Sequence, residues 1–347
     1  MDKNILVKRI EDQFGIDYKG YLMAIDDPTS YIGNRFLPVQ NTFDYDWVYN
    51  IFDNTVAVAR MKAAGDAEAP IVGGPAVKAI SGSIAPFGQK FQVNKSILNK
   101  IFNPRNDSEL KANLRTILNE SARNVRAAQA RREWLRWEFL AKGVIAINED
   151  KISLEVDMGV PTGNKLTSTD PEIAGGWATA ATATPLVDII RASEKYYTVN
   201  GFMPDLVTMR RANLLQVLNA DDTKAKIEVP SLETVNQYLA SYGMDYPRIE
   251  TYDEFVRFDN AAGRPVTKYH LIPANRIVFL KEAIGGDNLD QDIGRMLMGP
   301  VAENGFQPGI YADIFEETDP KKYWHYMAAE MWPAGYNPEF IMFATIN

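Results

Sequence analysis

The sequence predicts an α+β protein of two domains, and three observations predict it. One long helix is expected over 107–142, and a long extended segment precedes it at about 42–95. After the helix, 178–275 alternates helix and strand, which is typical of an α+β unit, and the tail is strand-rich. A chain of 347 residues is long enough for two domains. Because no linker divides it, we expect the chain to leave the first domain and return to it.

The segment 107–142 has the composition and the ends of one continuous helix. It contains no proline and no internal glycine, and it is rich in strong helix formers. The polar residues 106–108 offer an N-cap and Gly143 offers a C-cap. Ser121 and Arg132 interrupt its apolar stripe, which argues against a coiled coil. At roughly 50 Å, such a helix is expected to be a spine on which other layers pack. Two tryptophans are predicted to lie off the stripe: Trp134 and Trp137.

The chain before the helix divides into an N-terminal arm, 1–41, and an extended loop, 42–95. The arm is expected to hold one short helix ending near Phe14. In the loop, 56–60 and 80–91 are predicted to pair as a long hairpin whose tip is rich in Gly, Ala and Pro. The ribbon has too few large side chains to offset the entropy of ordering, about 1–2 kcal/mol per residue. It therefore either lies on a neighbouring copy of the protein or is a floppy loop.

The remaining helices and strands are predicted from the spacing of apolar residues along the chain. Ile145 and Ile147 face three apolar residues across a turn at 148–150, which predicts a hairpin. The tail, 296–347, is aromatic and strand-like. The block between them is predicted to hold helices at 185–198, 211–219 and 231–242, strands at 206–209, 248–252 and 276–280, and a polar loop at 221–229.

Composition excludes several classes of protein. There is no cysteine and there are only two histidines, which excludes disulfides, zinc–thiolate sites and multi-histidine metal sites. No apolar run approaches the ~20 residues that span a bilayer, and the N-terminus lacks the apolar core of a signal peptide. We therefore expect a protein made and kept in the cytoplasm. A net charge of −8 argues against a DNA reader, although not against a container into which DNA is forced.

The search for catalytic residues finds weak signals only. Neither histidine lies in a recognisable catalytic motif. A carbohydrate-active enzyme using paired carboxylates is an alternative, but such pairs are expected by chance among 45 acidic residues. The aromatic tail could be a sugar platform, although its alternation favours a sheet core or a subunit contact. The acidic pairs concerned are Asp44/Asp46, Glu316/Glu317 and Asp221/Asp222.

The long helix is basic within an acidic protein, and three readings of its arginines stay open. They form a nucleic-acid face, or they pair within the helix, or they contact acidic surface on a neighbouring subunit. The arginines are Arg115, Arg123, Arg126, Arg131, Arg132 and Arg136, and the acids within pairing distance are Glu120, Glu133 and Glu138.

The order of these elements resembles the major capsid proteins of tailed phages, which have the Hong Kong 97 capsid fold. Local sequence is similar to the phage lambda-type major head protein family. The similar segments are Leu140-Ala141-Lys142-Gly143, 155–159, Pro86, Val93-Asn94, Trp177, Thr318-Asp319-Pro320, Pro333 and Asn337-Pro338-Glu339-Phe340. The resemblance, carried by the order and spacing of these short segments, covers nearly the whole chain after about residue 20.

The resemblance implies an architecture. The arm is 1–41, and the extended loop, 42–95, lies over a neighbour. The peripheral domain combines 96–177, which includes the spine helix, with 276–347. An axial domain, 178–275, is inserted between these parts, and its tips meet at capsomer centres. A non-viral, encapsulin-like shell protein of the same fold is the alternative.

The resemblance also implies partners and contact residues. The chain would form pentamers and hexamers of an icosahedral head in the virion, assembled in the host cytoplasm around double-stranded DNA that is bound without sequence specificity. A separate scaffolding protein, a portal and often a decoration protein would join it, with no cofactor, catalytic residue or membrane. The expected subunit contacts of the loop are Arg60, Lys62, Lys78, Phe87 and Lys90. Those of the spine, toward a subunit or the inner surface, are Arg115, Arg123, Arg126, Arg132 and Arg136, and the axial loop offers Asp221, Asp222 and Lys224.

Overall fold

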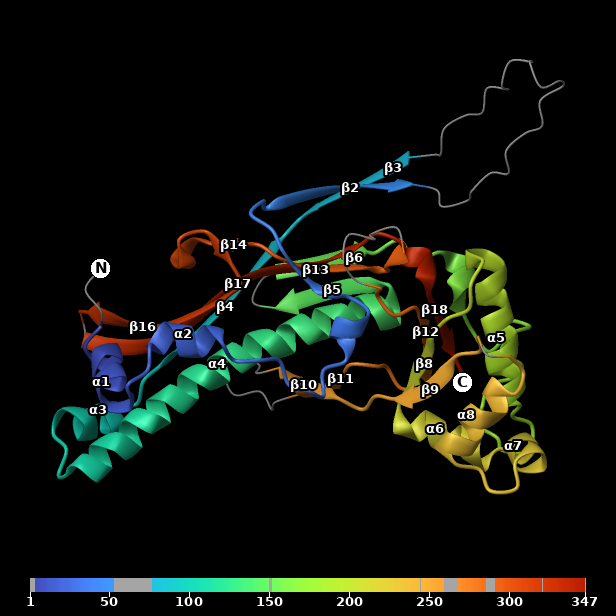
Figure 1. Cartoon of the computed structure of the whole chain (residues 1–347), viewed down its shortest axis with the longest axis horizontal. Coiled ribbons are helices and arrows are strands. Elements are labelled where there is room, and N and C mark those ends of the chain that lie inside the picture. Colours follow the sequence, from blue (N-terminus) through green and yellow to red (C-terminus); the bar gives the residue numbers. More distant parts are fainter. Residues whose placement is uncertain are drawn as a thin grey trace, which may run out of the picture.

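The molecule is elongated along one helix, α4 (Asp107–Lys142). The computed structural model describes residues 4–52, 77–149, 152–243, 245–258, 267–284, 291–319 and 321–346. In Figure 1, short helices gather at the start of α4, a helix-rich block lies beyond its far end, and a two-stranded ribbon stands away from the body.

The helix α4 has the predicted ends. The Asn106 side chain accepts a 2.8 Å hydrogen bond from the backbone N–H of Glu109, and Gly143 ends the helix at φ 68°. Trp134 and Trp137 lie off the predicted apolar stripe and are nevertheless buried. Every residue from 132 to 141 is buried, since layers surround this end of the helix on all sides. A helix packed all round has no single apolar stripe to read.

The central sheet packs on one face of α4. Its longest strand, β17 (Lys321–Gly335), pairs with β16 (Ile310–Thr318) and with β4 (Ala85–Gln92) along its first two thirds. Its last third pairs with β13 (Gly294–Met298), which in turn pairs with β1 (Val39–Asn41). The sheet thus joins segments from both ends of the chain.

A second sheet forms the core of the helix-rich block. Its strands, in order, are β7 (Lys165–Leu166), β18 (Ile341–Thr345), β12 (Arg276–Leu280), β8 (Leu206–Met209) and β9 (Arg248–Thr251). The helices around it are α5 (Pro185–Asn200), α6 (Arg211–Asn219), α7 (Asp221–Lys226) and α8 (Leu232–Ala240).

Two expectations for this block need correction. The predicted boundary at 275 cuts the second sheet, because β12 and β18 supply its middle strands although they follow that boundary. The predicted polar loop at 221–229 begins with a turn of helix, α7, whose Asp222 pairs with Lys226 at 2.8 Å. The other predicted helices and strands of the block are present to within two residues at either end.

The extended segment also differs from its prediction. The predicted strand at 80–91 is divided at Ile84: β3 (Val77–Ser83) pairs with β2 (Asp46–Phe52), whereas β4 joins the central sheet. Phe87 and Phe91 are partly buried on one side of β4, and Gln89 on the same side donates a hydrogen bond to Asn124 of α4, so these contacts hold β4 in its own molecule. The ribbon that stands free is therefore shorter than predicted. The other predicted strand, 56–60, lies outside the described residues.

The remaining elements are short. The predicted hairpin is present as β5 (Val144–Glu149) and β6 (Ile152–Asp157), with Ile145 opposite Val156 and Ile147 opposite Leu154. A second helix follows the predicted one in the arm. The other elements are α1 (Ile5–Phe14), α2 (Tyr18–Met23), α3 (Lys95–Phe102), β10 (Phe255–Phe258), β11 (Thr267–His270), β14 (Pro300–Val301), β15 (Gln307–Pro308) and 3-10 turns at Gly33–Arg35, Thr162–Asn164, Ala302–Asn304 and Pro338–Phe340. Across the described ranges, each helix is too short or too polar to span a lipid bilayer.

Candidate functional site

Three of the predicted spine arginines form an exposed basic face on the first two thirds of α4. Arg115, Arg123 and Arg126 all point to solvent. Their spacing of eight and three residues keeps them on one side of the helix. None of them forms a salt bridge with another described residue. This face is free to meet an anionic partner.

The other two predicted spine arginines are not available to a partner, which corrects the expectation for them. Arg136 is 1% exposed and lies 3.2 Å from Glu133. Burial lowers its pKa. Arg132 is buried against Met298 and pairs with Asp27 of the arm. Both arginines bind the N-terminal arm to α4. The prediction that the spine arginines pair with acids of their own helix therefore holds for Arg136 and fails for Arg115, Arg123 and Arg126.

The carboxylate of Glu133 is the centre of a buried cluster that we call the Glu133 clamp. Its Oε1 accepts hydrogen bonds from the Gly33 backbone N–H at 2.9 Å, the Trp137 indole at 2.8 Å and the Tyr252 hydroxyl at 2.9 Å. Arg136, bonded to Oε2, also donates to the Asn34 side chain at 2.8 Å. The clamp therefore joins the arm, α4 and the end of β9 at one point.

A second buried cluster joins the arm to β17 across α4. His325 is fully buried, with Nδ1 2.8 Å from the Ser121 hydroxyl and Nε2 3.2 Å from Glu120. The Tyr18 hydroxyl donates to Ser121 at 2.7 Å. Burial lowers the pKa of His325 to about 4. The hydrogen-bonded row of Ser121, His325 and Glu120 resembles a hydrolase triad. Because Ser121 is 2% and His325 0% exposed, no substrate reaches them.

The predicted contact residues of the extended loop are dispersed. Phe87 and Lys90 lie on β4, Phe87 partly buried under Arg131 and Lys90 exposed above the Trp324 ring at 5.0 Å. Lys78 lies on β3 opposite Ile51. Two further predicted contacts lie outside the described residues: Arg60 and Lys62. The contact of all five with another copy stays a prediction.

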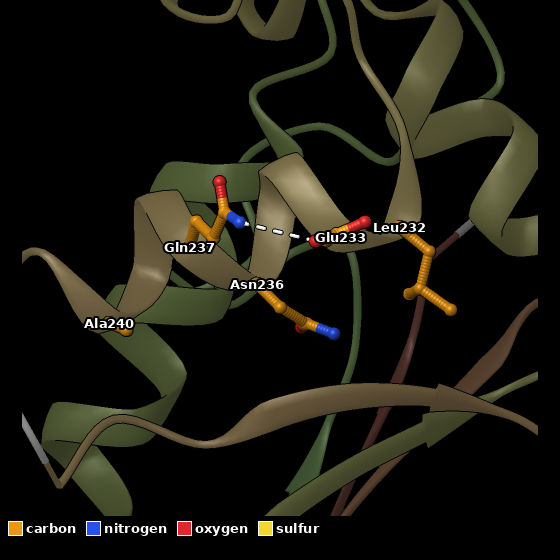
Figure 2. A pocket seen from close by; sticks show the side chains of 5 residues that line it. All are labelled: Leu232, Glu233, Asn236, Gln237 and Ala240. Carbon is orange, nitrogen blue, oxygen red and sulfur yellow. Dashed lines mark hydrogen bonds between the residues drawn. The ribbon is translucent and has the colours of Figure 1, made fainter.

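The predicted axial loop lies at the far end of the molecule from the N-terminal helices (Figure 1). Asp221 and Lys224 on α7 are exposed, and Asp222 is partly exposed and paired with Lys226. A surface hollow lies nearby on α8. Figure 2 shows its side chains, which come from one helix and include a single carboxylate, Glu233, that accepts a 3.4 Å hydrogen bond from Gln237. One carboxylate on one helix face offers neither a nucleophile nor an acid–base pair.

The predicted acidic pairs have ordinary surface roles. Glu316 binds Lys321 at 2.7 Å, and Glu317 accepts a hydrogen bond from the Trp324 indole at 2.9 Å. Asp44 and Asp46 are exposed at the base of the ribbon. Within the parts of the chain that the structure describes, no three metal-binding side chains come together.

The sequence reading missed one surface. The central sheet has a face turned away from α4 that carries Tyr311, Phe315, Trp324 and Tyr326, and we call it the outer face. Within the aromatic tail, Tyr323 and Trp332 are buried, whereas Trp324 and Tyr326 are partly exposed. Period-2 alternation along 322–326 was the signal that could have separated the two sets.

Comparison with known proteins identifies the family. Residues 20–346 match the family described as phage major capsid protein E. The chain belongs to this family. No curated protein matches the capsid protein closely enough in sequence to count as a relative.

Solved structures agree on the fold. A capsid protein of an Escherichia coli CFT073 prophage is similar at a TM-score of 0.61 and 14% identity, covering 100% of this chain and 99% of that one. A phage-related protein from Bordetella bronchiseptica RB50 is similar at a TM-score of 0.53 and 12% identity, and the match covers 94% of this chain and 95% of that one. A protein of Mycobacterium phage Bobi is similar at a TM-score of 0.50 and 12% identity, and the match covers 93% of this chain and 92% of that one. The predicted Hong Kong 97-like fold is confirmed.

Family and fold together establish the general role. The capsid protein is a structural subunit that assembles with copies of itself into a phage shell, and its place is the virion. The surfaces described above are therefore best considered as contacts in an assembly.

Proposed function

We propose that this capsid protein forms pentamers and hexamers that close into an icosahedral head around the double-stranded DNA of a tailed phage. The supporting observation is the ribbon of β2 and β3. Among the residues that the structure describes it pairs with no third strand, and it leaves Phe43 and Val48 at its base 67% and 66% exposed. A two-stranded ribbon is marginally stable alone, so a neighbouring subunit is its natural support.

The proposed domain roles follow the two sheets. The peripheral domain consists of α4 and the central sheet, and the axial domain consists of the second sheet with α5 to α8. The axial domain thus takes 178–275 together with β12 and β18. Asp221, Asp222 and Lys224 of α7 would lie near the capsomer centre.

The basic face of α4 is proposed to contact the interior contents. Arg115, Arg123 and Arg126 could bind DNA phosphates or an acidic scaffold without reading sequence. A net charge of −8 keeps this attraction local, so that the shell does not hold its genome tightly. A separate scaffolding protein, a portal and a decoration protein complete the proposed assembly in the host cytoplasm. We propose no catalytic role and no cofactor.

Expression of the chain, alone and with a scaffolding protein, tests this proposal. Negative-stain microscopy should show closed particles of uniform diameter. The matched variant replaces 53–76 by an Asn-Gly turn, since Phe52 and Val77 are directly opposite in the ribbon and a two-residue turn can join them. We expect this variant to fold but not to form shells. Compact monomers from the wild-type chain under both conditions would refute the shell.

A further inference from the structure

A cavity lies at the base of the ribbon, between the ribbon and the hairpin of β5 and β6. Its volume is about 530 Å³, and the residues that line it come mainly from β2, β3, β4, β6 and β17. Small-molecule sites usually measure about 300–1,000 Å³ and lie where separate structural units meet. The cavity is therefore of a size that holds one small organic molecule.

The walls of the cavity are apolar and come from three separate elements. Trp47 of β2 lines the ribbon side, Leu154 and Val156 of β6 line the hairpin side, and Trp332 of β17 lines the side of the central sheet. The Trp47 indole lies over Gly82, its register partner, where a Cβ would come within 2.8 Å of the ring. Two indoles and two aliphatic side chains favour a ligand with a flat, apolar body.

The lining also limits the charge of the ligand. Among the described residues that line the cavity, Asp157 is the only one with an ionisable side chain. Asp157 is exposed, and its Oδ1 accepts a hydrogen bond of 2.9 Å from the Gly159 N–H. An anionic ligand would meet this carboxylate and no cation in the lining, which is unfavourable. The ligand should therefore be neutral or positively charged, and the hydroxyls of Ser81 and Ser83 can bond a polar group on it.

The two sides of the cavity are held apart by contacts of their own. At the base of the ribbon, Ile84 is 6% exposed, and its N–H donates a 2.8 Å hydrogen bond to the Tyr45 carbonyl. The end of the hairpin is fixed to the end of α4, because the Met158 N–H donates to the Gly143 carbonyl at 3.0 Å. Apolar walls that cannot close on each other stay in contact with water. A ligand that displaces this water is stabilised by the hydrophobic effect.

We propose that the cavity binds one small aromatic molecule that is neutral or positively charged. Because such a ligand touches the ribbon and the hairpin together, it also fixes the direction of the ribbon relative to the body. The proposal goes beyond the role in a shell and does not depend on a shell being formed. The competing occupant is an apolar side chain of a second copy of this chain, which would fill the same space in particles.

Two fluorescent probes that differ in charge test the site. N-phenyl-1-naphthylamine is neutral, and 8-anilinonaphthalene-1-sulfonate has the same rings with a sulfonate added. Before assembly, the full chain should bind one neutral probe per chain, about tenfold more tightly than the anionic one. Asp157→Asn keeps an oxygen for the Gly159 N–H but removes the charge, so it should reduce this preference to about threefold or less. Energy transfer from tryptophan to the bound probe should fall in Trp47→Phe. A preference that is unchanged in Asp157→Asn would overturn the assigned ligand class.

Filling the cavity should remove the binding. Leu154→Trp places a larger side chain at a position that is 38% exposed, and it should lower the affinity for the neutral probe by about tenfold or more. The matched control is Ile152→Trp, because Ile152 lies on the same side of β6 and is 61% exposed but does not line the cavity. It should bind the probe as the wild type does. Equal affinities of the two variants would overturn the site.

The direction of the ribbon is measured with spin labels, which can be placed singly because the chain has no cysteine. Val48→Cys on the ribbon and Ser153→Cys on the hairpin are both at exposed positions. Saturation with the neutral probe should narrow the distribution of distances between the two labels. An unchanged distribution would overturn the effect on the ribbon.

Particles provide the last comparison. The neutral probe should bind to particles as it binds to subunits. Particles that exclude the probe while subunits bind it would assign the cavity to a contact between copies and overturn the ligand site. A chain that binds the probe but forms no particles would support the ligand site and refute the shell proposal alone.

Discussion

The hydroxyl of Tyr252 donates a hydrogen bond of 2.9 Å to Glu133, although the two residues are 119 positions apart. The Tyr252 ring also stacks on Trp137, one turn further along α4, with ring centres 4.8 Å apart. Tyr252 follows β9 in the second sheet, so this contact fixes the second sheet to the spine. Because Gly33 donates to the same carboxylate oxygen, the N-terminal arm is fixed at the same point. The clamp therefore fixes the second sheet and the N-terminal arm to the same point of α4.

Removing the Tyr252 hydroxyl should weaken the clamp. Tyr252→Phe leaves a buried carboxylate with one donor fewer, which typically costs about 1–3 kcal/mol. We expect the free energy of unfolding of the unassembled chain to fall by that amount in a urea titration. Tyr242→Phe is the control, because Tyr242 is exposed and shares its hydrogen bond with Tyr238 at the surface. An equal effect of the two substitutions would contradict the clamp.

A methyl group at Gly33 should disturb the clamp from the other side. A Cβ there would lie 2.7 Å from Glu133 Oε2 and 2.9 Å from Arg136 Cδ, well inside contact distance. Overpacking of this kind costs about 1–3 kcal/mol. Gly163→Ala has open space around its new methyl group and is the matched control. Thermal unfolding should show a lower midpoint for Gly33→Ala alone, and equal midpoints would mean that the arm is not held as described.

The sequence predicted an element correctly wherever the signal for it lay in residues close together in the chain. The N-cap, the glycine C-cap and the absence of breakers predicted both ends of α4, and period-2 alternation predicted the hairpin of β5 and β6. The division of 80–91 at Ile84 was not predictable. It depends on whether the strand meets a partner in its own molecule, and β17, the partner of β4, lies more than 200 residues away.

The candidate site was less predictable than the fold. Six arginines on one helix look alike in sequence, yet Arg136 is buried and Arg126 is exposed, because only tertiary packing decides which side of α4 is covered. The Glu133 clamp had no sequence signal, since its donors come from the arm, the helix and the second sheet. The outer face did have a signal, but only the register of β16 and β17 brings its rings together.

Stability should depend on pH through His325. Its pKa of about 4 in the folded chain lies below the ordinary value near 6.5, so the unfolded chain binds the proton more tightly. The neutral imidazole therefore contributes stability that is complete above about pH 6.5 and is lost as pH falls toward 4. The loss should reach up to about 3 kcal/mol by urea titration at a series of pH values. His325→Gln should lose this slope while His270→Gln keeps it, and a slope that survives in His325→Gln would refute the assignment.

Replacing arginines of α4 by alanine should distinguish the exposed arginines, which are proposed to serve assembly, from buried Arg136, which stabilises the fold. Replacing Arg115, Arg123 and Arg126 together by Ala should change the free energy of unfolding by no more than about 0.5 kcal/mol per site, because exposed side chains contribute little. Arg136→Ala should cost about 3–5 kcal/mol, because it leaves Glu133 buried without its charged partner.

If the basic face meets DNA or an acidic scaffold, the triple variant should still fold but should assemble with less scaffold or retain less DNA, and the difference should shrink as salt rises. Sedimentation of particles with their contents measures both. A triple variant that unfolds like Arg136→Ala would show that the three arginines support the helix itself, and normal contents at every salt concentration would remove the basic face from assembly.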